Sequence, residues 1–130
     1  MKIQDKNNEL IATVIFFKDL KNGRNFITDD DQEFQAGTFV YEKNTKVNRH
    51  VHKKNERKTY FTSEAIVVFS GQLRIEIYDD ERNILNEIIL GDKDTIIFHK
   101  GGHLIEILKD STFIEFKQGP YNQIDDKEIF

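Results

Sequence analysis

The chain has 130 residues, of which 38% are hydrophobic and 32% charged, and its net charge at pH 7 is −4. This length suits one domain with a buried core, so we expect a single domain over residues 1–130. The mildly acidic balance argues against a nucleic-acid-binding protein, which normally carries a basic face. The chain contains no cysteine, which excludes disulfides, thiolate metal ligands and cysteine nucleophiles.

The amino-terminal part of the chain gives no sign of export or membrane insertion. Its first six residues are polar and lack the apolar region of a signal peptide. The first apolar run, residues 10–17, is too short to cross a bilayer. We therefore expect a soluble, cytoplasmic protein with no membrane partner.

The composition and the periodicity of the sequence both favour β-structure. The 11 Phe and the many β-branched residues fit a pleated, half-buried surface. No long stretch keeps a 3.6-residue period, and short apolar runs alternate with turn residues, which is typical of a sandwich or barrel. We expect strands at residues 10–17, 34–41, 47–52, 65–69, 72–78, 84–90, 95–98, 103–108 and 112–117.

The clearest alternation is in residues 72–78, where Leu73, Ile75 and Ile77 share one face. Turns are expected at residues 21–24, 70–71 and 109–110, among others, and the acidic run 29–31 reads as a loop. Residues 1–9 are expected to be loosely attached. Residues 118–128 should be irregular, and Tyr121 within them is a possible hydrogen-bond donor to a ligand.

All four histidines fall into two clusters, His50 with His52 and His99 with His103. His50 and His52 are two positions apart, so on a strand both point to the same face. Their Cα atoms would lie ~6.6 Å apart, and both imidazoles could reach one ion through bonds of ~2.1 Å. This pair alone is weak evidence for a metal site. His103, which follows a Gly-Gly turn and shares a face with apolar residues, strengthens it.

From His50 to His103 the sequence resembles the two-motif signature of the cupin superfamily. In the first motif an HxH pair is followed by a glutamate seven positions before a glycine, as Glu64 stands before Gly71. In the second motif a glycine precedes a histidine by about ten or eleven positions. Gly91 and His103 fit this spacing with one extra residue.

The resemblance implies an all-β fold, a single cupin-type double-stranded β-helix or jelly-roll barrel. Its core would span about residues 34–118, with an N-terminal strand at about residues 10–17. It also implies one divalent transition metal, which could be iron, manganese, nickel or zinc. The ligands that the resemblance implies are His50, His52, Glu64 and His103.

Two further residues, Glu56 and His99, leave the composition of the ligand set open. Eleven residues separate His52 from Glu64, which is longer than the usual gap, and Glu56 satisfies the shorter spacing but lacks the following glycine. Glu64 is preferred and Glu56 is the alternative. His99 stands across a glycine turn from His103, so we expect it at the rim or in solvent, and whether it joins the site stays open. Glu106 alternates out of phase with His103 and is expected on the surface.

Three functions suit these residues. The first is a metal-dependent enzyme, an oxygenase or isomerase, acting on a small polar or sugar-like molecule, since such a ligand set leaves open positions on the ion. The second is a non-enzymatic cupin that binds or senses a small ligand, and the third is a metal-free nucleotide-sugar isomerase or epimerase with a histidine base. No separate catalytic residue stands out. We expect a homodimer, formed by exchanging or adding edge strands.

Overall fold

The structure is a computed structural model that describes residues 1–120 and 127–130. No helix in this part of the chain is long and apolar enough to cross a membrane. A single 3-10 turn, η1, covers Phe17–Asp19. The described residues form eight strands: β1 (Lys2–Gln4), β2 (Leu10–Ile15), β3 (Gly23–Phe26), β4 (Gly37–Val40), β5 (Glu64–Tyr78), β6 (Ile84–Leu90), β7 (Thr95–Phe98) and β8 (Gly102–Lys117).

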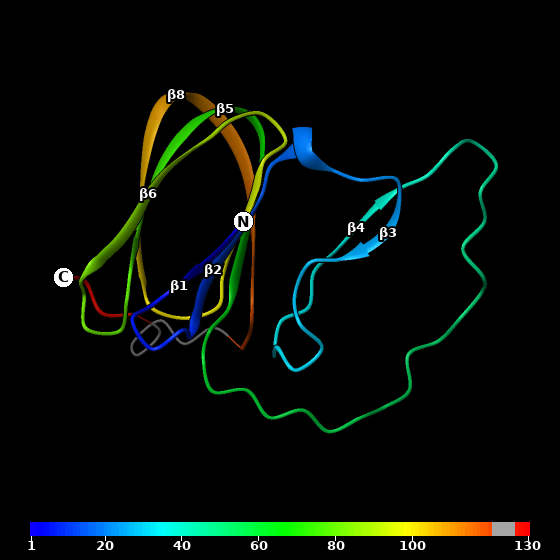
Figure 1. Cartoon of the computed structure of the whole chain (residues 1–130), viewed down its shortest axis with the longest axis horizontal. Coiled ribbons are helices and arrows are strands. Elements are labelled where there is room, and N and C mark those ends of the chain that lie inside the picture. The colour runs from blue at the N-terminus through cyan, green and yellow to red at the C-terminus, as the bar shows by residue number, and fades with distance from the viewer. Residues whose placement is uncertain (121–126) are drawn as a thin grey trace.

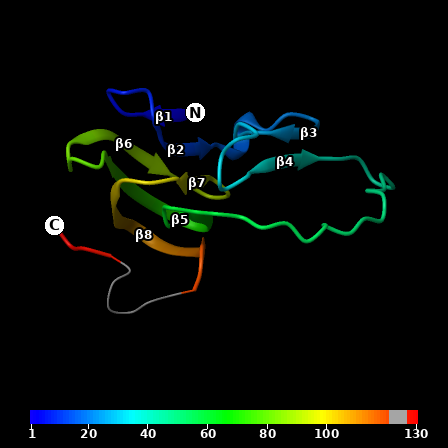
Figure 2. The ribbon, with the colours of Figure 1, turned by 90° about the horizontal axis from the view of Figure 1, so that it is seen from below.

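An antiparallel six-stranded sheet carries the core, and the expected all-β class is confirmed. The strand order is β1-β2-β7-β5-β6, with β8 paired to β5, while β3 and β4 form a separate two-stranded sheet. The first half of β5 pairs with β7 and its second half with β6, and β8 follows β5 through both halves. These strands bend together and so form two layers, although the described strands do not close into a barrel (Figure 1, Figure 2).

The bend of β5 is centred on Gly71. This residue has φ +106°, and the pairing with β8 shifts register between Val68 and Leu73. A Cβ at Gly71 would lie 2.1 Å from Ser111 Oγ and 2.5 Å from the Asp110 carbonyl oxygen, so β8 crosses against this glycine. The expected turns at 70–71 and 109–110 are therefore bends inside continuous strands, and the four expected strands on either side of them merge into β5 and β8.

The apolar face between the two layers is the one that the alternation predicts. Leu73, Ile75 and Ile77 are each fully buried, which confirms the pattern in residues 72–78. They pack in one cluster with side chains from the other layer, including Ile66 and Ile96. On the opposite, outer face Glu106 is exposed as expected and forms an ion pair with Arg74.

The amino-terminal region differs from the prediction. Residues 1–9 are not loose, because β1 pairs with β2 and the amino group of Met1 donates a hydrogen bond of 2.6 Å to the Val14 carbonyl. Residues 23–26, expected near a turn, instead form β3 against β4. These short, largely polar segments are strands because a neighbouring strand pairs with their backbone.

Residues 41–63 form an extended segment, which we call the arm, between the end of β4 and the start of β5. Figure 1 shows the arm running away from the body of the protein and returning to it. All arm residues are described, and none of them is in a strand, so the strand expected at residues 47–52 is wrong. That prediction required a neighbouring strand, and none of the described strands pairs with residues 47–52.

The end of the chain is only partly described. Residues 118–120, 127 and 128 are not in strands, as expected for an irregular tail, and neither are residues 129 and 130. The remainder of that prediction, and the candidate donor Tyr121, fall on residues 121–126, which lie outside the described residues.

We predict that Gly71→Ala destabilises the protein by about 2 kcal/mol or more, because the positive φ is strained for alanine and the added methyl meets β8. Gly91→Ala is the matched control, since a Cβ there would meet only Asp94 Oδ2 at 3.9 Å. Urea unfolding of both variants measures the difference. Equal stabilities would show that the bend does not depend on glycine.

Candidate metal and ligand site

The register of the long strands brings Glu64 and His103 together. Glu64 begins β5 and pairs with Phe98 of β7, whereas His103 lies near the start of β8 and pairs with Ile77. Ile77 and Phe98 are both buried core residues, so Glu64 and His103 both face the space between the layers. The His103 Nε2 atom lies 3.3 Å from Glu64 Oε2, although 38 residues separate them in sequence.

His103 is partly buried and its ring contacts an aromatic side chain. Its ring stacks on Phe98, with ring centroids 4.0 Å apart and an interplanar angle of 12°. Burial lowers the pKa of His103 below its usual value of 6.5, although the Glu64 carboxylate acts in the opposite direction. The imidazole is therefore neutral at pH 7. A neutral imidazole can bind a metal, or donate or accept a proton.

Glu64 lies between two nitrogen groups. Its second carboxylate oxygen, Oε1, is 3.4 Å from Lys117 Nζ, and its side chain is only 15% exposed. A partly buried carboxylate needs such partners to offset the loss of hydration. Glu64 therefore lies between the His103 imidazole and the Lys117 amino group, where β5 begins and β8 ends.

A cavity of about 720 Å³ contains this pair. Its volume suits a small molecule, and both aromatic and charged side chains contribute to its wall. Besides the two central residues, the lining includes Tyr60, Phe61, Phe98, Asp80, Arg82 and Lys100.

The other two predicted ligands, His50 and His52, lie together on the arm. Their ring centroids are 5.3 Å apart. The Nδ1 atom of His50 lies 2.8 Å from the Asn48 carbonyl oxygen, to which it donates, so Nε2 carries the free electron pair when the ring is neutral. Both histidines are exposed, and neither is among the described residues that line the cavity.

The four predicted ligands thus form two separate pairs in this structure. Within residues 1–120 and 127–130 there is no group of three or more histidine, cysteine or acidic side chains that could hold a metal ion. The alternative ligand Glu56 is exposed on the arm, whereas Glu64 contacts His103. The geometry therefore favours Glu64 over Glu56 as the partner of His103.

His99 lies in a different place from the one expected. It is buried, with 7% of its surface exposed, rather than at the rim. Its backbone N–H donates to the Ile11 carbonyl at 2.8 Å, which extends the β2–β7 pairing by one residue, and its Nε2 lies 3.0 Å from Thr13 Oγ1. Because side chains alternate along a strand, His99 points to the face of β7 opposite Phe98 and His103.

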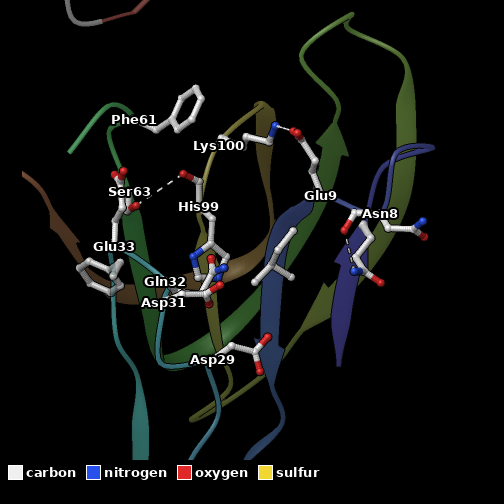
Figure 3. A pocket seen from close by; sticks show the side chains of 13 residues that line it. Asn8, Glu9, Asp29, Asp31, Gln32, Glu33, Phe61, Ser63, His99 and Lys100 are labelled. Carbon is white, nitrogen blue, oxygen red and sulfur yellow. Dashed lines mark hydrogen bonds and ion pairs between the residues drawn. The ribbon is translucent and has the colours of Figure 1, made fainter. Parts of the chain in front are cut away.

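A second cavity, of about 510 Å³, opens beside His99 (Figure 3). Acidic side chains from two segments lie around it, among them Glu9, Asp29 and Glu33. Lys100 lines both cavities and forms ion pairs with Glu9 and Asp80. Nothing in the sequence pattern singled out this cavity, because its walls come from loops that meet only in the folded chain.

The comparisons with known proteins give no match to this chain among family models, curated proteins or solved structures.

We predict that acid destabilises the protein partly through His99. Burial, with a smaller effect from the charge of Lys2, lowers the pKa of His99 below 6.5 in the folded chain. The unfolded chain therefore takes up more protons, and stability is lost as the pH falls below about 6.5 towards the folded pKa. In His99→Gln this loss is absent, while any contribution of His103 remains. Urea unfolding at pH 7 and pH 5 should show a smaller acid effect in His99→Gln than in the natural chain; an equal effect would contradict the assignment.

Proposed function

We propose that the protein is a metal-binding cupin that acts as an enzyme on a small polar or sugar-like molecule. The observation that carries this proposal is the contact of 3.3 Å between Glu64 and His103 in a cavity large enough for such a molecule. A carboxylate oxygen beside a neutral imidazole nitrogen is half of a common ligand set for divalent transition metals.

His50 and His52 supply the other half in this proposal. They are already adjacent, and the hydrogen bond from His50 Nδ1 to the Asn48 carbonyl leaves Nε2 as the donor atom for a metal. The four ligands come together only when the arm lies against the opening between the layers. Three imidazoles and one carboxylate leave positions on an octahedral ion for a substrate, and iron, manganese, nickel and zinc all accept such ligands. When bound, the ion would act as a Lewis acid or a redox centre.

The proposed cupin jelly roll is consistent with the two bent layers. Strands β5 and β8 cross from one layer to the other, and the layers already share one apolar core. The open side is where a further strand would complete a barrel. We propose that residues 47–52 form this strand when the arm docks, because a neighbouring strand would then exchange backbone hydrogen bonds with them.

One observation favours a second function without a metal. An imidazole oriented by a carboxylate is also the arrangement of a general base. In that case His103 would accept a proton from a bound sugar-like substrate, and Glu64 would stabilise the charged ring, as in an isomerase or epimerase. The metal content of the protein separates the two functions.

We predict that the purified protein, expressed without a polyhistidine tag, contains about one equivalent of a divalent transition metal per chain. His50→Ala with His52→Ala, and separately His103→Ala, should lose most of it, because each removes ligands. Elemental analysis measures the content, and His99→Gln is the control that should retain the metal, since His99 faces the other cavity. Absence of metal from the natural chain would refute the metal site and favour the general base.

We also predict that the metal dissociates below about pH 6, because protons compete with the ion for imidazole nitrogens. Dialysis of the loaded protein at a series of pH values, followed by elemental analysis, measures this release. Full retention at pH 5 would be inconsistent with three histidine ligands.

A further inference from the structure

The arm has a charge opposite to that of the rest of the protein. Residues 41–63 contain seven basic and two acidic residues, a net charge of +5. The remaining chain contains 12 basic and 21 acidic residues, a net charge of −9. Opposite charge of this size attracts the arm to an acidic surface such as the body of another copy.

The side chains of the arm are largely exposed to solvent. Residues 41–62 all have exposed side chains, and Val51 is 86% exposed. The arm contacts the body near its end, where the Tyr60 N–H donates to Glu33 and the Gln118 side chain donates to Thr59. An extended segment gains stability in water mainly by packing and pairing with other strands. The arm therefore has the properties of a segment that pairs with another surface.

The edge of β8 is such a surface. Within residues 1–120 and 127–130, β8 pairs as a strand only with β5, so no described strand lies along its other edge. Large apolar side chains on this strand are exposed, among them Ile107 at 51% and Phe116 at 56%. A long, open, apolar edge is a template for an added strand.

We propose that the arm of one copy pairs with β8 of a second copy and completes that copy's metal site. His50 and His52 of the first chain would then join Glu64 and His103 of the second. The exchange is reciprocal, so two copies related by a two-fold axis would carry two sites. The proposal rests on the metal-binding function proposed above, and it adds that each site is built from two chains.

The direction of the arm favours a second copy over the chain's own β8. In both Figure 1 and Figure 2 the arm projects away from β8, on the side of β3 and β4. The contacts of Thr59 and Tyr60 hold its carboxyl end in this direction. Pairing with a second copy keeps these contacts, whereas pairing within one chain would require the arm to reverse its path.

The test is complementation between two defective chains. One variant carries His50→Ala with His52→Ala, and the other carries Glu64→Gln with His103→Gln. They are co-expressed with two different tags that do not bind metal, and the mixed pair is isolated through both tags in turn. If sites are built from two chains, each variant alone lacks metal, and the mixed pair contains about one equivalent per two chains.

The other outcomes separate the two proposals. Metal in the natural chain but none in the mixed pair would overturn the exchange and leave the metal site intact, with the arm closing on its own chain. Absence of metal from the natural chain would overturn the proposed function itself. Circular dichroism of each variant checks that it is folded, so that an empty site is not mistaken for an unfolded chain.

The mass of the protein in solution tests the exchange of the arm independently of its metal content. Light scattering should give the mass of two chains for the natural protein. It should give one chain when Lys53, Lys54 and Arg57 are all replaced by glutamate, because the arm then repels the acidic body. The matched control replaces Lys2, Lys6 and Lys21, outside the arm, by glutamate and should remain paired. A natural protein with the mass of one chain would overturn the exchange, and so would a dimer that survives reversal of the arm charges.

Discussion

The antiparallel pairing of β5 with β8 is the interaction on which the rest of the structure depends. It runs from Glu64 opposite Lys117 to Tyr78 opposite Gly102, and it continues through the bend at Gly71 with shifts in register. Because both strands pass from one layer to the other, the same ladder of hydrogen bonds builds the core and joins the layers. Glycine is required at the bend because the backbone has a positive φ there and β8 passes within contact distance.

The same pairing places polar groups where the apolar core ends. Ile75 and Ile77 on β5 are fully buried. His103 lies opposite Ile77 on β8, and its ring stacks on Phe98. A carboxylate and an imidazole in such a place lose hydration, and the contacts of Glu64 with His103 and Lys117 offset this loss. Titratable side chains in contact at the wall of a cavity are typical of functional sites, which is why this pair carries the proposed function.

The arm connects the proposed chemistry with the proposed assembly. It holds two histidines next to each other but outside the cavity, and it has a net charge of +5. A basic extended segment beside an acidic body with an open strand edge has complementary surfaces that two copies can share. Exchange of the arm would add a strand beside β8, bury exposed apolar side chains and complete the ligand set in a single step.

The sequence by itself determined the local features of this protein. Alternation in residues 72–78 predicted the buried face of Leu73, Ile75 and Ile77, and short apolar runs predicted an all-β chain, because side-chain direction along a strand depends only on its period. The resemblance to the cupin motifs also predicted that Glu64 and His103 belong to one ligand set, and in the structure these two side chains lie 3.3 Å apart. Only the tertiary structure decided that some expected turns are bends inside strands, that residues 47–52 are not in a strand, and that His99 is buried on the other face of β7. Strand pairing depends on backbone partners far away in the chain, and no local pattern specifies them.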